Sequence, residues 1–297
     1  MSFTVVVVLH DSDADLARLL ASLRGLPAGD EPQLVVVDTG SRDGGPARAR
    51  AAGAEVIELP DNPGFGAANN AGVARAQHDV CVLLNPDVEL LDGGLTALVA
   101  LARSRDVLLV PRLLESDGRP QRSGHPVPGR AAALLPAVLP PQLLPGAVRE
   151  RGEPWRARRP VTVGWAIAAV VVARTDLLRR LGPFDPEVFL FYEDLDLCLR
   201  ARAAGVPTEL HPEVALRHAG GHATGRHFGG EPHALLARRR RQVVGERLGR
   251  RALLLDDVAQ GLTFATRIAG RVALGRDPAR ERAQLAALRA ARRIGGL

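Results

Sequence analysis

Short apolar runs alternate with amphipathic segments throughout the first 110 residues, and this alternation restricts the possible folds more than any other feature of the chain. The run Phe3–Leu9 is rich in β-branched residues, as expected of a parallel strand buried on both faces. In Asp13–Gly25 the leucines recur at helical spacing. The order of strand and helix then repeats, which predicts an α/β fold with a doubly wound sheet. The further predicted strands are Gln33–Val37, Ala54–Leu59, Asp79–Leu84 and Val107–Val110, and the further helices are a short one capped by Asp43, Phe65–Ala76 and Gly93–Arg103.

The regular pattern stops after Pro111. Residues 115–160 are rich in Pro, Gly and Arg, and they predict a hairpin or loop near Asp117-Gly118 followed by an irregular insert. We place boundaries near residues 110 and 230, where the pattern changes. The remaining predicted elements are a strand over Val161–Ala173, helices over Arg174–Leu181 and Glu193–Ala204, short strands over Val206–Leu210 and Val214–Arg217, and arginine-rich helices beyond Pro232.

Charge is distributed unevenly along the chain. Residues 1–100 carry 14 acids and 6 arginines, whereas the last 60 residues carry 15 arginines and 5 acids. A basic tail of this kind indicates an anionic partner, such as a membrane surface, nucleic acid or a diphosphate lipid, unless these charges only form solvated helix faces. The run Arg238–Arg241 and the apolar residues after it have the composition of helices that lie on an anionic membrane. The alternative is that these helices pack on the rest of the chain or form a homodimer.

Two further features concern the compartment. Cys81 and Cys198 lie in separate apolar segments, so we expect buried free thiols rather than a disulfide or a metal cluster. The N-terminus runs directly into a strand pattern, which argues against a signal peptide. The longest clean apolar run, Val161–Ala173, is too short to span a bilayer. We therefore expect a cytoplasmic protein.

Polar residues follow several predicted strands, at the edge of the sheet where ligands bind in doubly wound folds. Asp38 closes the second strand and can hydrogen-bond a base or a ribose. The first strand is followed by His10-Asp11-Ser12-Asp13, which contains no glycine. The absence of a glycine fingerprint there argues against a dinucleotide oxidoreductase, and the absence of a Gly-rich basic loop argues against a nucleotidyltransferase.

Two loops near this edge suggest donor and metal binding. In Asn62–Asn70 a Pro-Gly turn permits close backbone approach and two asparagines lie near a helix start, although a turn with a helix cap would look the same. In Asn85-Pro86-Asp87 a carboxylate follows a buried strand and can bind Mg²⁺ or Mn²⁺ together with a diphosphate. Read alone, this tripeptide is also an ordinary turn.

An acidic triplet is the sharpest feature of the second half. Glu193, Asp194 and Asp196 fall within four positions, and mutual repulsion with partial burial raises the proton affinity of at least one of them. A general base for a hydroxyl needs this property. The alternative is an acidic helix N-terminus favoured by the helix dipole. His218 precedes a glycine turn and could complete a metal site, in competition with His222 and His227.

Taken in order, these motifs resemble the family 2 glycosyltransferases, and more narrowly the rhamnosyltransferase-like members. The resemblance covers about residues 3–228 and rests on Val35–Asp38, Asn62–Asn70, Leu84–Glu89, Gly182–Pro186 and Phe191–Arg200. It implies an inverting enzyme with the GT-A fold, a Rossmann-like, doubly wound mixed sheet. Residues 1–230 would then be the catalytic domain, with a nucleotide-binding half at 1–110 and an acceptor half at 111–230, and residues 231–297 a C-terminal helical extension.

The resemblance also implies a role for individual residues. Asp194 would be the catalytic base, and Asp87 and His218 would bind the metal, with Asn85 standing where the family's Asp-x-Asp motif has its first acid. Glu193, Asp196 and Trp165 are expected on the acceptor side. The expected contacts to the donor nucleotide are Asp11, Asp38, Asn62, Gly66, Asn69 and Asn85.

The expected reaction is transfer of a sugar from a nucleotide diphosphate donor, such as a dTDP- or UDP-sugar, to a hydroxyl group. The resemblance favours rhamnose as the sugar and a cell-envelope glycan or polyprenyl-linked acceptor, as in cell wall biogenesis. The expected place is the cytoplasm, at the inner face of the membrane, and no nucleic acid is expected as a partner. The alternative is a non-catalytic nucleotide-sugar-binding or scaffold protein of the same fold.

Overall fold

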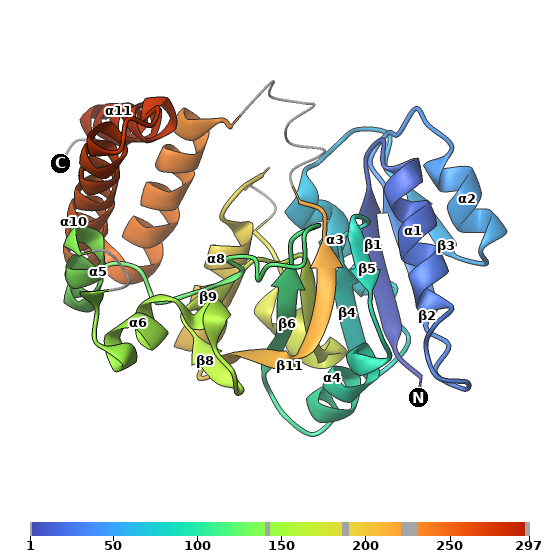
Figure 1. Cartoon of the computed structure of the whole chain (residues 1–297). Coiled ribbons are helices and arrows are strands. Elements are labelled where there is room, and N and C mark those ends of the chain that lie inside the picture. The colour runs from blue at the N-terminus through green and yellow to red at the C-terminus, as the bar shows by residue number, and fades with distance from the viewer. Residues whose placement is uncertain (1, 140–142, 186–189, 221–230, 295–297) are drawn as a thin grey trace. The chain divides into compact units, whose positions relative to one another are not determined.

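The computed structural model describes residues 2–139, 143–185, 190–220 and 231–294 (Figure 1). The chain forms two compact units. Unit 1 comprises Met1–His125 and Pro154–His227, and unit 2 comprises Pro126–Glu153 and Phe228–Leu297. The insert at 126–153, which the sequence analysis left within the acceptor half, therefore belongs with the C-terminal helices.

Unit 1 is built on a mixed sheet of nine strands, counted over the described residues. The first four strands along the chain are parallel and adjacent, so their carboxyl ends share one edge of the sheet. The doubly wound α/β prediction is confirmed. In spatial order the strands are β3 (Glu55–Glu58), β2 (Gln33–Asp38), β1 (Thr4–Leu9), β4 (Val80–Leu84), β10 (Val170–Arg174), β6 (Leu108–Leu114), β11 (Thr208–His218) and β5 (Val88–Leu90), and β8 (Val161–Val163) also pairs with β11.

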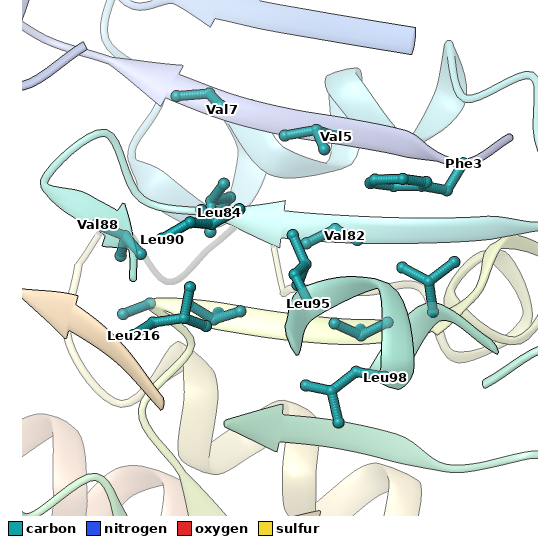
Figure 2. Close-up of a cluster of buried hydrophobic side chains, with 14 of the residues drawn as sticks. Phe3, Val5, Val7, Val82, Leu84, Val88, Leu90, Leu95, Leu98 and Leu216 are labelled. Atoms are coloured by element: carbon teal, nitrogen blue, oxygen red, sulfur yellow. The ribbon is translucent and has the colours of Figure 1, made fainter. Parts of the chain in front are cut away.

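Helices cover both faces of this sheet, and the alternation of side chains along β1 decides which residue meets which layer. Val5, Val7 and Leu9 face a core that includes Leu16 and Leu95, as the close-up of this core shows for Val5, Val7 and Leu95 (Figure 2). Val6 faces the opposite core. The first layer contains α1 (Asp13–Leu23), α2 (Gly45–Ala51) and α4 (Gly94–Ala102), and the second contains α3 (Phe65–Ala74), α7 (Thr175–Leu181) and α8 (Glu193–Ala203).

The second half of unit 1 differs from the sequence prediction in three places. The expected single strand over Val161–Ala173 is three short strands, β8, β9 (Trp165–Ala166) and β10, and β9 pairs with β7 (Gly124–His125) in a separate small sheet. The two short strands expected after residue 205 are one strand, β11, with an irregular register between His211 and Ala215. The strand β5, which the sequence analysis did not anticipate, pairs with the end of β11.

The hairpin expected near Asp117-Gly118 is confirmed. Gly118 has φ 80°, and its N–H donates to the Glu115 carbonyl at 2.9 Å. Leu114 and Pro120 form a bridge across the turn. A one-turn helix, η3 (Pro154–Arg156), then begins the return of the chain into unit 1.

Unit 2 is helical. The insert forms η1 (Ala131–Ala133), α5 (Leu134–Val138) and α6 (Gly146–Gly152), and the C-terminal part forms α10 (His233–Ala273) and α11 (Ala279–Ile294). Helix α10 is interrupted at Gly249, whose φ of 82° and ψ of 174° only glycine adopts readily. Its two halves fold back on each other, because Arg240 and Arg241 of the first half pair with Asp256 and Asp257 of the second. Half of the arginine run is therefore engaged inside this unit.

Two compartment features can be compared with the structure. Cys81 and Cys198 are both buried free thiols, as expected. No helix among the described residues is long and apolar enough to cross a membrane.

Candidate active site

The loops that follow β1 and β2 are joined by their own polar groups. Asp38, at the end of β2, is buried and accepts from the backbone N–H groups of Gly40 and Ser41 at 3.2 Å. The Asp11 carboxylate accepts from the Arg42 N–H at 2.7 Å, and the Asp11 N–H donates to the Ser41 hydroxyl at 3.0 Å. Asp11 has a φ of 49°, uncommon for a residue with a side chain. The two acids predicted to meet the nucleoside thus lie at one edge of the sheet, on adjacent loops that are hydrogen-bonded to each other.

The turn over residues 62–70 is fixed by packing. A Cβ on Gly66 would lie 2.8 Å from the Cβ of Phe184, so only glycine fits there. The Asn70 side chain donates to the Phe184 carbonyl at 2.8 Å and accepts from its N–H at 3.0 Å. Asn69 is buried and donates to the Phe65 carbonyl at 2.9 Å. Gly66 and Asn69 therefore hold the turn in place, and donor contacts by these two residues stay a prediction.

The beginning of this turn has an exposed polar residue. The Asn62 side-chain oxygen accepts from the Gly64 N–H at 3.0 Å, and Gly64 has a φ of 93°. Asn62 itself is exposed. Its amide nitrogen is therefore available for a ligand, in keeping with the predicted contact to the donor.

Asp87 and His218 come together although they are 131 positions apart in sequence. Asp87 precedes β5, His218 ends β11, and these two strands pair antiparallel with His218 opposite Val88. The His218 Nε2 lies 3.3 Å from the Asp87 Oδ1, and both side chains are largely buried. Burial alone would raise the pKa of Asp87, but the hydrogen bond from His218, its positive charge and backbone N–H groups outweigh burial and lower it. The carboxylate is therefore held in its charged form.

The other ring nitrogen of His218 is held by Gln121. Its Nδ1 lies 2.8 Å from the Gln121 side-chain oxygen, which can only accept. Nδ1 therefore carries a proton in both the neutral and the charged ring, and Nε2 is directed toward Asp87. Sequence reasoning missed Gln121, since nothing next to it marks a site. The available signal was the Asp117-Gly118 hairpin, which turns the chain back along β6 and so brings Gln121 beside that strand. In the structure the Gln121 N–H donates to the Leu113 carbonyl at 2.8 Å.

The Asp87–His218 pair fits a divalent cation. Two neighbouring ligands about 2.1 Å from one octahedral cation lie roughly 3 Å apart, close to the separation of these two atoms. The carboxylate suits Mn²⁺ or Mg²⁺, and the imidazole, a ligand typical of transition metals, favours Mn²⁺ of the two. No cluster of three or more His, Cys, Asp or Glu side chains that could hold a metal occurs in the described part of the chain. The remaining ligands would therefore have to come from water or from a bound diphosphate.

Beside this pair lies a pocket of about 330 Å³. Two arginines line it, Arg18 and Arg217, and each forms an ion pair with a carboxylate of the same pocket, Asp15 and Glu89 respectively. Asp87 also lines the pocket. The cation site thus opens onto a pocket that is lined by both arginines and carboxylates.

Asp194 lies near the start of α8, and most of its surface is buried although a smaller part stays exposed. Its Oδ1 accepts from the Leu195 N–H at 2.7 Å. Burial raises its pKa to about 6, although this hydrogen bond and another from the Ala168 backbone N–H act in the opposite direction. A carboxylate with a pKa in this range can accept a proton from a hydroxyl near neutral pH.

The segment between β9 and β10 connects Asp194 with the loop that carries Asp87. Ala168 donates its N–H to Asp194, and the next residue, Ala169, accepts from the Asn85 N–H at 2.9 Å. Asn85, the predicted donor contact, and Asp194 are therefore both anchored on one short piece of backbone. This places the predicted base and the predicted metal loop at the same edge of the sheet.

The two other acids of the triplet have different surroundings. Asp196 is buried and pairs with Arg200 at 2.7 Å, and Arg200 also donates to the carbonyls of Leu181, Gly182 and Pro183. Asp196 thus holds the loop that precedes the site. Glu193 is buried as well. Their predicted contacts with an acceptor stay predictions.

Both tryptophans and the single tyrosine of the chain lie close together, joined by ring contacts that include His125. Trp165 stacks on the His125 ring at 4.2 Å between centroids, and its ring lies 6.0 Å from that of Tyr192. Trp155 lies 5.9 Å from His125. Phe191 and Tyr192 both have positive φ, 72° and 63°, which is strained for aromatic residues and is typical of functional sites. Trp165, predicted on the acceptor side, is therefore close to the strained turn that leads into Asp194.

The sequence matches a known family model. The model of glycosyl transferase family 2 matches residues 4–144. An N-acetylglucosaminyl-diphospho-decaprenol L-rhamnosyltransferase of Mycobacterium tuberculosis is 30% identical over 242 residues, which cover 75% of this chain and 77% of the relative. A pre-mycofactocin glycosyltransferase of the same organism is 29% identical over 219 residues, which are 72% of this chain but only 42% of that protein.

Solved structures share the fold at low sequence identity. A mannosyltransferase from Pyrobaculum calidifontis, in complex with GDP-Man and Mn²⁺, has a TM-score of 0.59 at 16% identity, with 97% of this chain and 85% of that chain covered. GalNAc-T7, crystallised with UDP, GalNAc and Mn²⁺, has a TM-score of 0.58 at 18% identity. That match covers 82% of this chain and 48% of GalNAc-T7.

Proposed function

Since this chain belongs to glycosyl transferase family 2 and is a glycosyltransferase, we propose that it moves a sugar from a nucleotide diphosphate donor to an acceptor hydroxyl with inversion at the anomeric carbon. The observation that carries this mechanism is the environment of Asp194. Its carboxylate has a pKa raised to about 6 and is anchored by Ala168, next to the residue that anchors Asn85. A direct displacement needs the base and the donor to be held in a fixed position relative to each other, and anchoring Asp194 and Asn85 on neighbouring residues provides this.

The acceptor is activated by Asp194. The carboxylate takes the proton of the acceptor hydroxyl while the acceptor oxygen forms a bond to the anomeric carbon. The bond from that carbon to the diphosphate oxygen breaks, and its electron pair leaves with the nucleoside diphosphate. Attack opposite the leaving group inverts the configuration, and no covalent enzyme intermediate is formed.

The donor is held at the carboxyl ends of the parallel strands. Asp11 and Asp38 receive the nucleoside, and their loops need little rearrangement because they are already hydrogen-bonded to each other. Asn62 and Asn85 contribute polar groups from the two neighbouring loops. Asp87 and His218 would hold a divalent cation, Mg²⁺ or Mn²⁺, which neutralises charge on the departing diphosphate when bound.

The relatives support a proposal for the donor and the acceptor. The M. tuberculosis relative is named for rhamnose and for an N-acetylglucosaminyl-diphospho-decaprenol acceptor. For this chain we therefore propose a dTDP- or UDP-linked sugar, with rhamnose the first candidate, and a polyprenyl-linked or other cell-envelope glycan as acceptor. Residues 1–110 would bind the donor nucleotide and residues 111–230 the acceptor. Such an acceptor implies work in the cytoplasm at the inner face of the membrane.

Donor turnover tests the proposal. The purified protein is incubated with dTDP-rhamnose, UDP-glucose and related donors, with Mn²⁺ or Mg²⁺, and release of nucleoside diphosphate is measured with and without a GlcNAc-diphosphate-lipid acceptor. We expect metal-dependent release that the acceptor accelerates. Tight binding of donor without any turnover, with every donor and acceptor, would instead indicate a non-catalytic sugar-nucleotide-binding protein.

A further inference from the structure

Exposed apolar side chains concentrate in unit 2. Eleven large hydrophobic residues are exposed in the part of the chain that the structure describes, and ten of them belong to unit 2. Only Leu91 lies in unit 1. A soluble protein rarely gathers so many in one place unless they meet a partner or a membrane.

The second half of α10, residues 250–273, has an inner and an outer face. Asp256 and Asp257 lie on the inner face, where they pair with Arg240 and Arg241 of the first half. Leu253 and Ala259 are buried on that face too. The only acids of this half-helix are therefore turned inward and neutralised.

The outer face is apolar. Leu254, Val258 and Leu262 follow at four-residue spacing and are 39%, 46% and 36% exposed. Helical geometry carries the same stripe to Ala265, Ala269 and Val272, all of them exposed. The stripe thus extends over five helical turns without an acid.

Helix α5 widens this stripe. The Thr266 hydroxyl donates to the Ala137 carbonyl at 2.8 Å, and Thr266 lies one turn beyond Leu262 on the same side of α10. The outward residues of α5 and its continuation are apolar as well, and all are exposed: Leu135, Val138, Leu139 and Leu143. We refer to this set, together with Leu254, Val258, Leu262 and Val272, as the apolar face of unit 2.

Arginines border this face and identify its occupant. Arg250 and Arg251 are exposed at the start of the half-helix, and Arg276 is exposed just beyond its end. An apolar stripe flanked by arginine is typical of helices that lie in the interface of an anionic bilayer. A second copy of the chain would bring the same basic borders together, and their repulsion disfavours that pairing.

We infer that the apolar face of unit 2 docks on an anionic lipid surface, with Leu254, Val258 and Leu262 inserted between the headgroups and Arg250 and Arg251 on the phosphates. A polyprenyl-linked acceptor lies in a membrane, so docking on lipid would bring the protein to the acceptor. This inference rests on the proposed function. The docking surface belongs to unit 2 alone and contains no residue of the candidate active site.

Flotation of the full-length protein with vesicles tests the inference. We expect binding to vesicles of phosphatidylglycerol and phosphatidylcholine, none to phosphatidylcholine alone, and weaker binding at higher salt. Val258→Asp and Leu262→Asp should each lower the partition coefficient about tenfold, since each places a charge where the docked protein would insert an apolar side chain into the bilayer. Arg250→Gln and Arg251→Gln should each lower it about fivefold. Leu91→Asp and Arg24→Gln, at exposed positions of unit 1, are the matched controls and should bind as the wild type does.

Three results would overturn the inference: no binding to any vesicle, equal binding by all variants, or a dimer in sedimentation that Val258→Asp dissociates. Melting temperatures of all variants show that each is folded. Donor hydrolysis in solution separates the two proposals. If Val258→Asp loses vesicle binding but hydrolyses donor at the wild-type rate, the docking surface and the proposed function both stand. If neither the wild type nor any variant hydrolyses donor while vesicle binding behaves as expected, only the proposed function fails.

Discussion

Asp194 differs from its two acidic neighbours in what surrounds it, which the sequence could not reveal. The triplet itself was visible, but all three acids fit the same motif. In the structure Asp196 is committed to Arg200, Glu193 is buried, and Asp194 is partly exposed with a raised pKa. Arg200 lies one helical turn after Asp196, so that pairing is local, whereas the Ala168 N–H that reaches Asp194 comes from a distant segment that neighbouring sequence does not signal.

The first prediction at this scale concerns the base. Asp194→Asn should lower the transfer rate at least about 100-fold, because the amide keeps the shape but cannot take the proton. Nucleoside diphosphate binding, measured by calorimetry with Mn²⁺, should stay within about threefold of wild type. In the wild type, kcat should rise with pH through an apparent pKa of about 6. Asp196→Asn is the comparison, and a larger loss of kcat there at unchanged melting temperature would transfer the role to Asp196.

The raised pKa also predicts a pH-dependent change in stability. Well below pH 3.8, the ordinary pKa of this group, Asp194 is protonated in the folded and unfolded chain alike. As the pH rises from 3.8 to about 6, the unfolded chain has released this proton while the folded chain retains it, so the folded state loses stability over this window. Asp194→Asn removes that loss. Its melting temperature relative to wild type should therefore be a few degrees higher near pH 8 than near pH 4, and a difference independent of pH would contradict the burial argument.

A further prediction concerns the cation pair and its support. Asp87→Ala and His218→Ala should each weaken the enhancement of nucleoside diphosphate binding by Mn²⁺. Gln121→Ala should weaken Mn²⁺ affinity about tenfold, since the histidine ring loses the partner that orients it. Gln121→Glu, which keeps an acceptor oxygen, should restore it. Glu89→Ala removes a carboxylate of the same pocket that pairs with Arg217 and should leave the Mn²⁺ effect unchanged.

At the scale of helices and strands, local pattern was enough where an element is long and buried. The β-branched residues of β1 and β2 and the leucine spacing of α1 predicted those elements to within about two residues. The three-residue strand β5 was missed, because Val88–Leu90 becomes a strand only by pairing with the end of β11. Its residue Leu90 pairs with Leu216, which is 126 positions later in the sequence. Asp87 and His218 meet through that same long-range pairing.

Helix α10 gives an element-scale prediction. Gly249 reverses the chain with a backbone conformation that alanine does not adopt, so Gly249→Ala should destabilise the protein by roughly 1–3 kcal/mol. Gly270 is in the helical interior with open space around it. Gly270→Ala should therefore stabilise by up to about 1 kcal/mol. Urea unfolding of the two variants measures both effects, and similar changes in both would mean that the reversal at Gly249 carries no strain.

At the scale of the whole molecule, composition predicts the sign of the charge in the C-terminal region but not which groups that charge contacts. A run of four arginines suggested a surface, yet Arg240 and Arg241 meet Asp256 and Asp257 across the reversal at Gly249. Gly249 lies inside a helical sequence pattern, and the pattern alone does not predict that the chain reverses there. The insert at 126–153, expected to be irregular, contains helices that belong to the same unit. These facts depend on tertiary pairing, which composition does not contain.

Ligand binding should stabilise the two units unequally. All candidate nucleotide and cation ligands lie in unit 1, so nucleoside diphosphate with Mn²⁺ at 100 times its Kd should raise the stability of that unit by about 2.7 kcal/mol. Calorimetry should show the transition of unit 1 shifting upward while that of unit 2 stays in place. A comparison of dTDP, UDP and GDP then ranks the bases that Asp11 and Asp38 accept. An equal shift of both transitions would mean that the ligand also contacts unit 2.

The departure of the chain from unit 1 has a consequence for protein engineering. The chain leaves after His125 and returns at Pro154, and the two ends of this excursion are neighbours, since the His125 ring lies 5.9 Å from the buried Trp155 ring. A segment with adjoining ends can change length at little cost in closure entropy. We therefore expect changes in the length of residues 126–153 to leave the register of Trp165 and the placement of Asp194 in unit 1 unchanged, and to act only on unit 2, where this segment contacts α10 through Ala137 and Thr266.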